Sequence, residues 1–121
     1  MTTKNGTVDF EYKAGVSDTV GVVLKQNGAA IDLTGYSIVF NMKDNSDHRF
    51  SVPCSLGGTK DGVEYTAEHG GCTIEFAAEH LAIVGEFNGE FVGTLAGKEF
   101  IIPNGDEYFI VMIYEAIVGV V

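Results

Sequence analysis

Several classes of protein are excluded by what this sequence of 121 residues lacks. It has only seven basic residues against 17 acidic ones, and the net charge of −10 opposes binding to phosphate backbones and anionic lipids. No run of about 18 or more uncharged apolar residues is present, and residues 1–6 lack the apolar core of a signal peptide. We therefore expect no nucleic-acid partner, no membrane partner and no export from the cytoplasm in which the chain is made.

Cysteine is also scarce. Cys54 and Cys72 are too few for a disulfide framework and too isolated for a zinc site, so we expect two free, packed thiols. The sequence does not show whether they ever pair. Residues 44–47 (Asp-Asn-Ser-Asp) offer oxygen ligands but lack the glycine and glutamate of a helical calcium loop, which favours a solvated loop over a weak cation site. No metal and no cofactor are expected.

No arrangement of residues points to catalysis. The histidines (His48, His69 and His80) stand in polar segments or in a short helical segment, away from any nucleophile or metal-ligand spacing, and are expected at the surface. No serine has the Gly-x-Ser-x-Gly surroundings of a hydrolase nucleophile. Residues 57–60 (Gly-Gly-Thr-Lys) lack the frame of a phosphate loop and are interpreted as a turn. The sequence therefore predicts a protein with no catalytic residues, not an enzyme.

The sequence is rich in glycine, with 16 glycines and only two prolines, and its apolar residues recur at every second position. Asn27-Gly28 is typical of a tight hairpin turn, and Pro53 indicates a strand at a sheet edge. Residues 77–83 favour a short helical crossover. The strands expected from the alternation lie near residues 8–13, 20–24, 36–43, 50–54, 63–65, 72–76, 85–95, 100–102 and 108–114. This pattern predicts an all-β fold, a two-layer antiparallel β-sandwich of about seven to nine strands, in a single domain over residues 1–121.

The end of the chain is unusually apolar. Residues 108–121 contain one charged residue, Glu115. One interpretation is a central strand covered by the other sheet on one face and by the short helix or a loop on the other; the alternative is contact with another subunit. For the second case the expected interface residues are Ile110, Met112, Tyr114, Ile117, Val118, Val120 and Val121.

Three segments carry a family resemblance. They are GAAIDLTG followed by YSIVFNMK at 28–43, LAIVGEFNGEF at 81–91, and FIIPNG followed by YFIV at 100–111. Their order and spacing resemble the amino-terminal domain of the phage baseplate upper protein family, a small immunoglobulin-like sandwich in virions of tailed phages. The resemblance covers about residues 20–114 and implies an immunoglobulin-like β-sandwich with no catalytic residues.

The resemblance further implies a virion protein, assembled in the host cytoplasm, that docks on other virion proteins. Baseplate upper proteins continue beyond this domain, whereas this sequence ends at Val121, so we expect attachment to the particle and not the holding of receptor-binding proteins. Capsid decoration and attachment at a baseplate, tail or fibre are both open, and a homo-oligomer or many copies on a symmetric particle is expected. The alternative is a carbohydrate-binding adhesion module, which the absence of tryptophan and the mostly inward alternation of the tyrosines disfavour.

Overall fold

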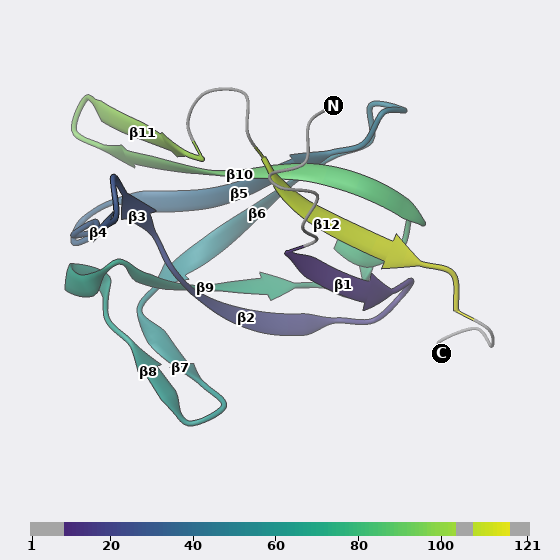
Figure 1. The fold of residues 1–121 in the computed structure, drawn as a ribbon, viewed down its shortest axis with the longest axis horizontal. Helices are drawn as coiled ribbons and strands as arrows, with labels where there is room; N and C mark the ends of the chain where they lie inside the picture. Colours follow the sequence, from purple (N-terminus) through teal and green to yellow (C-terminus); the bar gives the residue numbers. More distant parts are fainter. Residues whose placement is uncertain (1–8, 104–107, 117–121) are drawn as a thin grey trace.

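Short strands joined by tight turns make up most of the described residues, which are 9–103 and 108–116 of a computed structural model (Figure 1). In chain order the strands are β1 (Phe10–Lys13), β2 (Asp18–Val23), β3 (Lys25–Gln26), β4 (Ala29–Ala30), β5 (Ser37–Lys43), β6 (Arg49–Leu56), β7 (Gly58–Lys60), β8 (Val63–Tyr65), β9 (Gly71–Phe76), β10 (Gly85–Leu95), β11 (Lys98–Ile102) and β12 (Phe109–Tyr114). Two short 3₁₀ helices, η2 (Ala67–His69) and η3 (Ala78–Leu81), precede and follow β9. The all-β prediction is confirmed.

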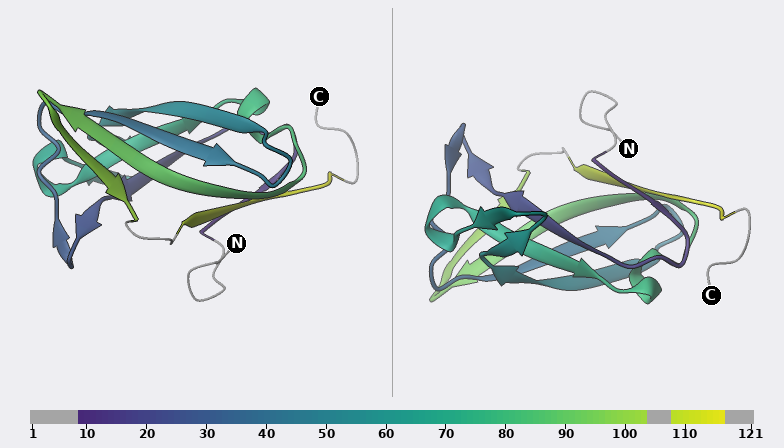
Figure 2. Two further views of the ribbon diagram at one scale, coloured as in Figure 1. Left: turned by 90° about the horizontal axis from the view of Figure 1, so that it is seen from above. Right: turned by 90° about the horizontal axis from the view of Figure 1, so that it is seen from below.

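Eight of these strands form one curled sheet, with the order β1-β12-β10-β5-β6-β9-β2 and β11 added beside β10. The strands β1 and β2 are consecutive in sequence but lie at opposite ends of this order. On a flat sheet, six spacings would separate them by roughly 29 Å. The link of residues 14–17 reaches at most about 18 Å. The sheet must therefore curl until its two ends approach, and this produces the two layers seen edge-on in Figure 2.

Aromatic side chains fill the space between the layers. The ring of Phe40 on β5 lies 5.9 Å from that of Phe76 on β9 and 4.8 Å from that of Phe91 on β10. Phe10 on β1 packs edge-on against both Phe40 and Phe76. Such tilted and edge-to-face pairs are the preferred arrangements of aromatic rings. The aromatic core therefore extends without a break from β1, at one end of the sheet order, to β9, which is next to the other end.

The clearest predicted strands form as expected. Ile38, Phe40 and Met42 of β5 are buried, as the alternation over residues 36–43 predicts. The strand β10 spans Gly85–Leu95, with Phe87 and Phe91 buried. The predicted hairpin at Asn27-Gly28 joins β3 to β4, with positive φ angles of 54° and 81° at its two central residues.

Four details differ from the sequence-based expectations. The strand β6 lies inside the sheet, although Pro53 indicated an edge; the ladder with β9 begins only at Cys54, so Pro53 itself faces one neighbouring strand. Residues 58–60 form the short strand β7, where a turn was expected. The pairing of β1 with β12 is parallel in an otherwise antiparallel sheet. The predicted helical crossover is the 3₁₀ helix η3, whose last residue, Leu81, is buried.

Candidate interaction surface

The last strand, β12, has a core face and an outward face. Val111 and Ile113 are buried in the core. Met112 and Tyr114 alternate with them and point outward, where Met112 is half-buried and Tyr114 is 38% exposed. Ile110 lies on the same side of β12 as Met112 and Tyr114 but is fully buried. A partner would therefore contact Met112 and Tyr114 first.

The structure therefore brings three of the expected interface residues onto one face. The other four lie outside the described residues: Ile117, Val118, Val120 and Val121. Since β12 runs between β1 and β10, it has a neighbour on each side, as the interpretation of a central strand requires. The exposure of Tyr114 leaves room for the alternative, contact with another subunit, which stays a prediction.

Charged side chains frame the two apolar ones. In the parallel register of β1 with β12, Glu11 lies beside Met112 and Lys13 beside Tyr114. In the antiparallel register of β10 with β12, Glu86 lies on the other side of Met112. We refer to Glu11, Lys13, Glu86, Met112 and Tyr114 as the β1–β12 surface. An apolar centre with a charged rim is the usual composition of a protein interface.

Electrostatic contacts order this surface. The Lys13 Nζ atom lies 5.9 Å from the centre of the Tyr114 ring, within the range of a cation–π interaction. Desolvation raises the pKa of the Tyr114 hydroxyl above its ordinary value, and the adjacent Glu11 carboxylate raises it further. A hydrogen bond with the Glu11 carboxylate acts in the same direction on the pKa of Tyr114.

Two buried oxygen atoms on the outward side of β10 have no hydrogen-bond partner among the described residues. They are Oε2 of Glu86 and Oδ1 of Asn88. Native proteins leave few buried polar atoms unpaired, because each unpaired atom loses its contact with water without replacement. Asn88 lies opposite Ile110, so both atoms border the outward side of β12. Sequence reasoning missed them, since only the pairing in three dimensions reveals an unsatisfied atom.

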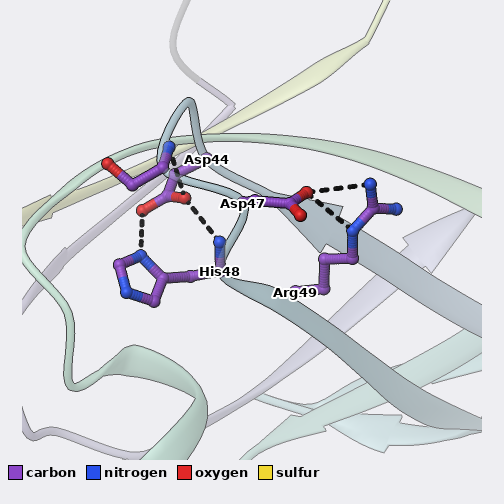
Figure 3. A network of polar contacts seen from close by, with 5 residues as sticks. Asp44, Asp47, His48 and Arg49 are labelled. Atoms are coloured by element: carbon purple, nitrogen blue, oxygen red, sulfur yellow. Dashed lines mark hydrogen bonds and ion pairs between the residues drawn. The ribbon is translucent and has the colours of Figure 1, made fainter.

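The loop from β5 to β6 is closed by its own side chains (Figure 3). Oδ1 of Asp44 accepts hydrogen bonds from the backbone N–H groups of Ser46 and His48, at 3.0 and 2.8 Å, and Oδ2 lies 2.8 Å from Nδ1 of His48. Desolvation would raise the pKa of Asp44, but the hydrogen bonds from His48 and Ser46 lower it below the ordinary 3.8. Asp47 pairs with Arg49 at 2.8 Å. The carboxylates thus serve the loop itself and do not converge on a cation.

The remaining candidate groups do not form a site. Cys54 and Cys72 are free thiols, as predicted; a hydrogen bond with Cys72 and burial raise the pKa of Cys54, which makes it a poor nucleophile. His48 and His69 are exposed, whereas His80 is half-buried and its Nδ1 accepts the backbone N–H of Ala77 at 2.9 Å. Within residues 9–103 and 108–116, no three His, Cys, Asp or Glu residues cluster as metal ligands. In the same ranges, no helix has the length and apolar character needed to cross a membrane.

A scan against protein-family models found no match, and a search of curated proteins found none either. Among solved structures, the chain is similar to the N-terminal domain of phage TP901-1 ORF48. The two are 16% identical, with a TM-score of 0.57, and the similarity covers 94% of this chain and 90% of that one. At this identity the similarity shows the fold alone. The fold extends over nearly the whole sequence, beyond the segments that carry the family resemblance.

Proposed function

We infer that this chain is a non-enzymatic structural module of a phage virion, which docks on other virion proteins. The observation that carries this proposal is the shared fold with the N-terminal domain of phage TP901-1 ORF48 over 94% of the chain. The sequence resemblance to the amino-terminal domain of baseplate upper proteins supports the same conclusion. A fold by itself does not determine function, so the proposal also needs a surface suited to docking.

The β1–β12 surface is the docking site that we propose. Tyr114 and Met112 supply the apolar contact, and Tyr is enriched at the centres of protein interfaces because it adds a large ring with a polar tip. Glu86 has an unpaired buried oxygen that a donor from a partner would satisfy after a small side-chain rotation. Ile117, Val118, Val120 and Val121 follow β12 in the sequence and extend the proposed interface.

Repetition would provide the strength of attachment. Two outward apolar side chains cannot by themselves hold a stable complex, since stable interfaces bury on the order of 1,200–2,000 Å². Many copies on a symmetric particle raise the effective concentration for each further contact. The net charge of −10 keeps unbound copies apart before assembly. Capsid decoration and attachment at a baseplate, tail or fibre both agree with this arrangement.

The test is co-purification with phage particles made in the same cells as the chain. We expect the wild-type chain to sediment with the particles in a density gradient and the double variant Met112→Lys/Tyr114→Asp to remain in the soluble fraction. Val63→Asp is the matched control, because Val63 is 52% exposed and lies on β8, in the hairpin that projects away from β12 in Figure 1. This control should sediment with the particles.

Two outcomes would contradict the proposal. If the wild-type chain stays soluble when particles form, it is not a virion component. If Val63→Asp is lost from the particles while the double variant remains on them, docking uses another surface. Circular dichroism of each purified variant confirms that the fold is intact before the comparison is made.

A further inference from the structure

A hollow of about 450 Å³, with a mixed polar and apolar lining, lies beside β5, β6 and β10. This volume is within the usual range for small-molecule sites. Its polar lining comes from Asn41, Lys43, Arg49, Ser51, Asn88 and Glu90. The register places Asn88 beside Lys43 and Lys43 beside Arg49, so these side chains form one row across three strands. None of them belongs to the β1–β12 surface.

The charges around the hollow balance. Lys43 and Arg49 are two of only seven basic residues in the chain and lie directly opposite each other. Arg49 is already paired with Asp47, through Nη2 at 2.8 Å and Nε at 2.9 Å. Lys43 on β5 and Glu90 on the neighbouring β10 take part in no ion pair among the described residues. A ligand with a net charge of either sign therefore gains no overall attraction here, and the loss of water from its charge makes its binding weaker than that of a neutral ligand.

Hydrogen-bonding groups of both kinds are available. The Ser51 hydroxyl donates to Oδ1 of Asn41 at 2.6 Å, which fixes the Asn41 amide and leaves its two N–H donors free for another acceptor. Oδ1 of Asn88 is buried and accepts no hydrogen bond among the described residues, so it becomes available to a ligand after a rotation of the amide toward the hollow. Glu90 adds an acceptor and Lys43 a donor. The lining thus offers both donors and acceptors to a ligand whose groups can do both.

Met42, Phe50 and Tyr108 complete the lining. Tyr108, the residue before β12, is half-buried and borders the hollow. The apolar face of a ring of this kind can cover the C–H face of a sugar, while fixed amide and carboxylate groups bind its hydroxyls. We propose that this hollow binds a neutral saccharide, held by Asn41, Asn88 and Glu90 and packed against Tyr108. Every sugar hydroxyl is both donor and acceptor, which matches the mixed and charge-balanced lining.

This proposal goes beyond attachment to a particle and is tested on the pure full-length chain. The probe is an array of defined oligosaccharides in which each neutral member is matched by one with a carboxylate or phosphate on the same backbone. We expect binding to at least one neutral oligosaccharide and weaker binding to its anionic counterpart. Glu90→Gln and Tyr108→Ala should each weaken the affinity by about tenfold or more, the loss expected for one good contact. Ser37→Ala, an exposed position on β5 outside the hollow, should leave the affinity unchanged.

Nuclear magnetic resonance locates the site independently of the variants. Adding the bound neutral oligosaccharide to the labelled chain should shift the amide signals of Asn41, Ser51 and Asn88 and leave those of Thr59 and Val63 in place. Three results would overturn the proposal: no saccharide binds, the anionic members bind as well as the neutral ones, or the shifts lie outside the hollow. Binding of a peptide in place of a sugar is also a contradiction. None of these results changes the co-sedimentation test, so the two proposals fail separately.

Discussion

The side chain of Tyr12 joins the two ends of the sheet. Its hydroxyl donates to Oδ2 of Asp18 at 3.1 Å, so β1 at one end of the strand order is tied to β2 at the other. The ring of Tyr12 also packs 5.7 Å from that of Phe76. Burial raises the pKa of Tyr12 well above its ordinary 10, and the carboxylate of Asp18 raises it further.

Replacing Tyr12 with phenylalanine should lower the free energy of unfolding by about 1 kcal/mol at neutral pH, the usual net value of one hydrogen bond. The free energy of unfolding of the variant should also depend less on pH above pH 10 than that of the wild type. Above pH 10 the unfolded chain loses the phenol proton that the folded chain keeps, so the free energy of unfolding of the wild type falls as the pH rises. Urea denaturation at pH 7 and pH 11 measures both effects. A wild type and a variant that lose equal stability between these pH values would contradict the assignment.

The backbone of β10 at Gly89 lies in close contact with the ring of Phe40. A Cβ atom at this position on β10 would overlap the ring of Phe40, so Gly89→Ala should destabilise the fold by about 1–3 kcal/mol through overpacking. Thr94→Ala, at an exposed position on the same strand, is the control and should cost less than about 0.5 kcal/mol. Thermal denaturation compares the two variants. Equal melting temperatures for Gly89→Ala and the wild type would show that the ring has space to move.

At the scale of elements, the loop between β5 and β6 owes its shape to Asp44. Because the pKa of this carboxyl lies below 3.8, the contribution of the loop to stability is present above about pH 4 and is lost as the pH falls through the lowered pKa. The amide proton signals of Ser46 and His48 should therefore titrate with a midpoint below 3.8 in the wild type and not in Asp44→Asn. Asp47→Asn is the control and should retain the titration, since Asp47 pairs with Arg49 instead. A midpoint at or above 3.8 would contradict the hydrogen bonds drawn in Figure 3.

The elements most accurately predicted from sequence were those in which side-chain alternation is long. Burial alternates along the whole of β5 and from Glu86 to Thr94 in β10, and a helix, with its period of about 3.6 residues, would not bury every second residue over such a length. The short strand β7 (Gly58–Lys60) was missed because Gly-Thr-Lys contains no apolar residue to alternate. The edge predicted from Pro53 was wrong for β6 as a whole. A proline requires only that no neighbouring strand needs its missing N–H group, and β9 pairs with β6 only from Cys54 onward.

Long-range features were beyond the reach of sequence reasoning. The parallel pairing of β1 with β12 joins segments about a hundred residues apart, and no turn signal specifies it. The unpaired oxygens of Glu86 and Asn88 depend on which residues surround them. By contrast, the strand itself was predicted from the apolar run at 108–114, but because that run is apolar on both faces only the structure shows that Met112 and Tyr114 point outward.

At the scale of the whole molecule, a charge of −10 and an apolar last segment act in opposite directions on self-association. Salt screens the repulsion between copies over about 10 Å at 0.1 M, so association of the pure chain should increase with salt. Removal of residues 115–121 should abolish that increase, because Ile117, Val118, Val120 and Val121 are lost. Sedimentation velocity at low and high salt measures the effect. A chain that stays monomeric throughout, with and without these residues, would argue against the proposed interface.

Cryo-electron microscopy of phage particles that carry the chain tests most directly whether it is a virion module. We expect density for this β-sandwich in many symmetry-related copies, with Met112 and Tyr114 facing a neighbouring virion protein and the β7–β8 hairpin pointing away from it. Particles without such density, or copies attached through the β7–β8 hairpin with the β1–β12 surface open to solvent, would contradict it.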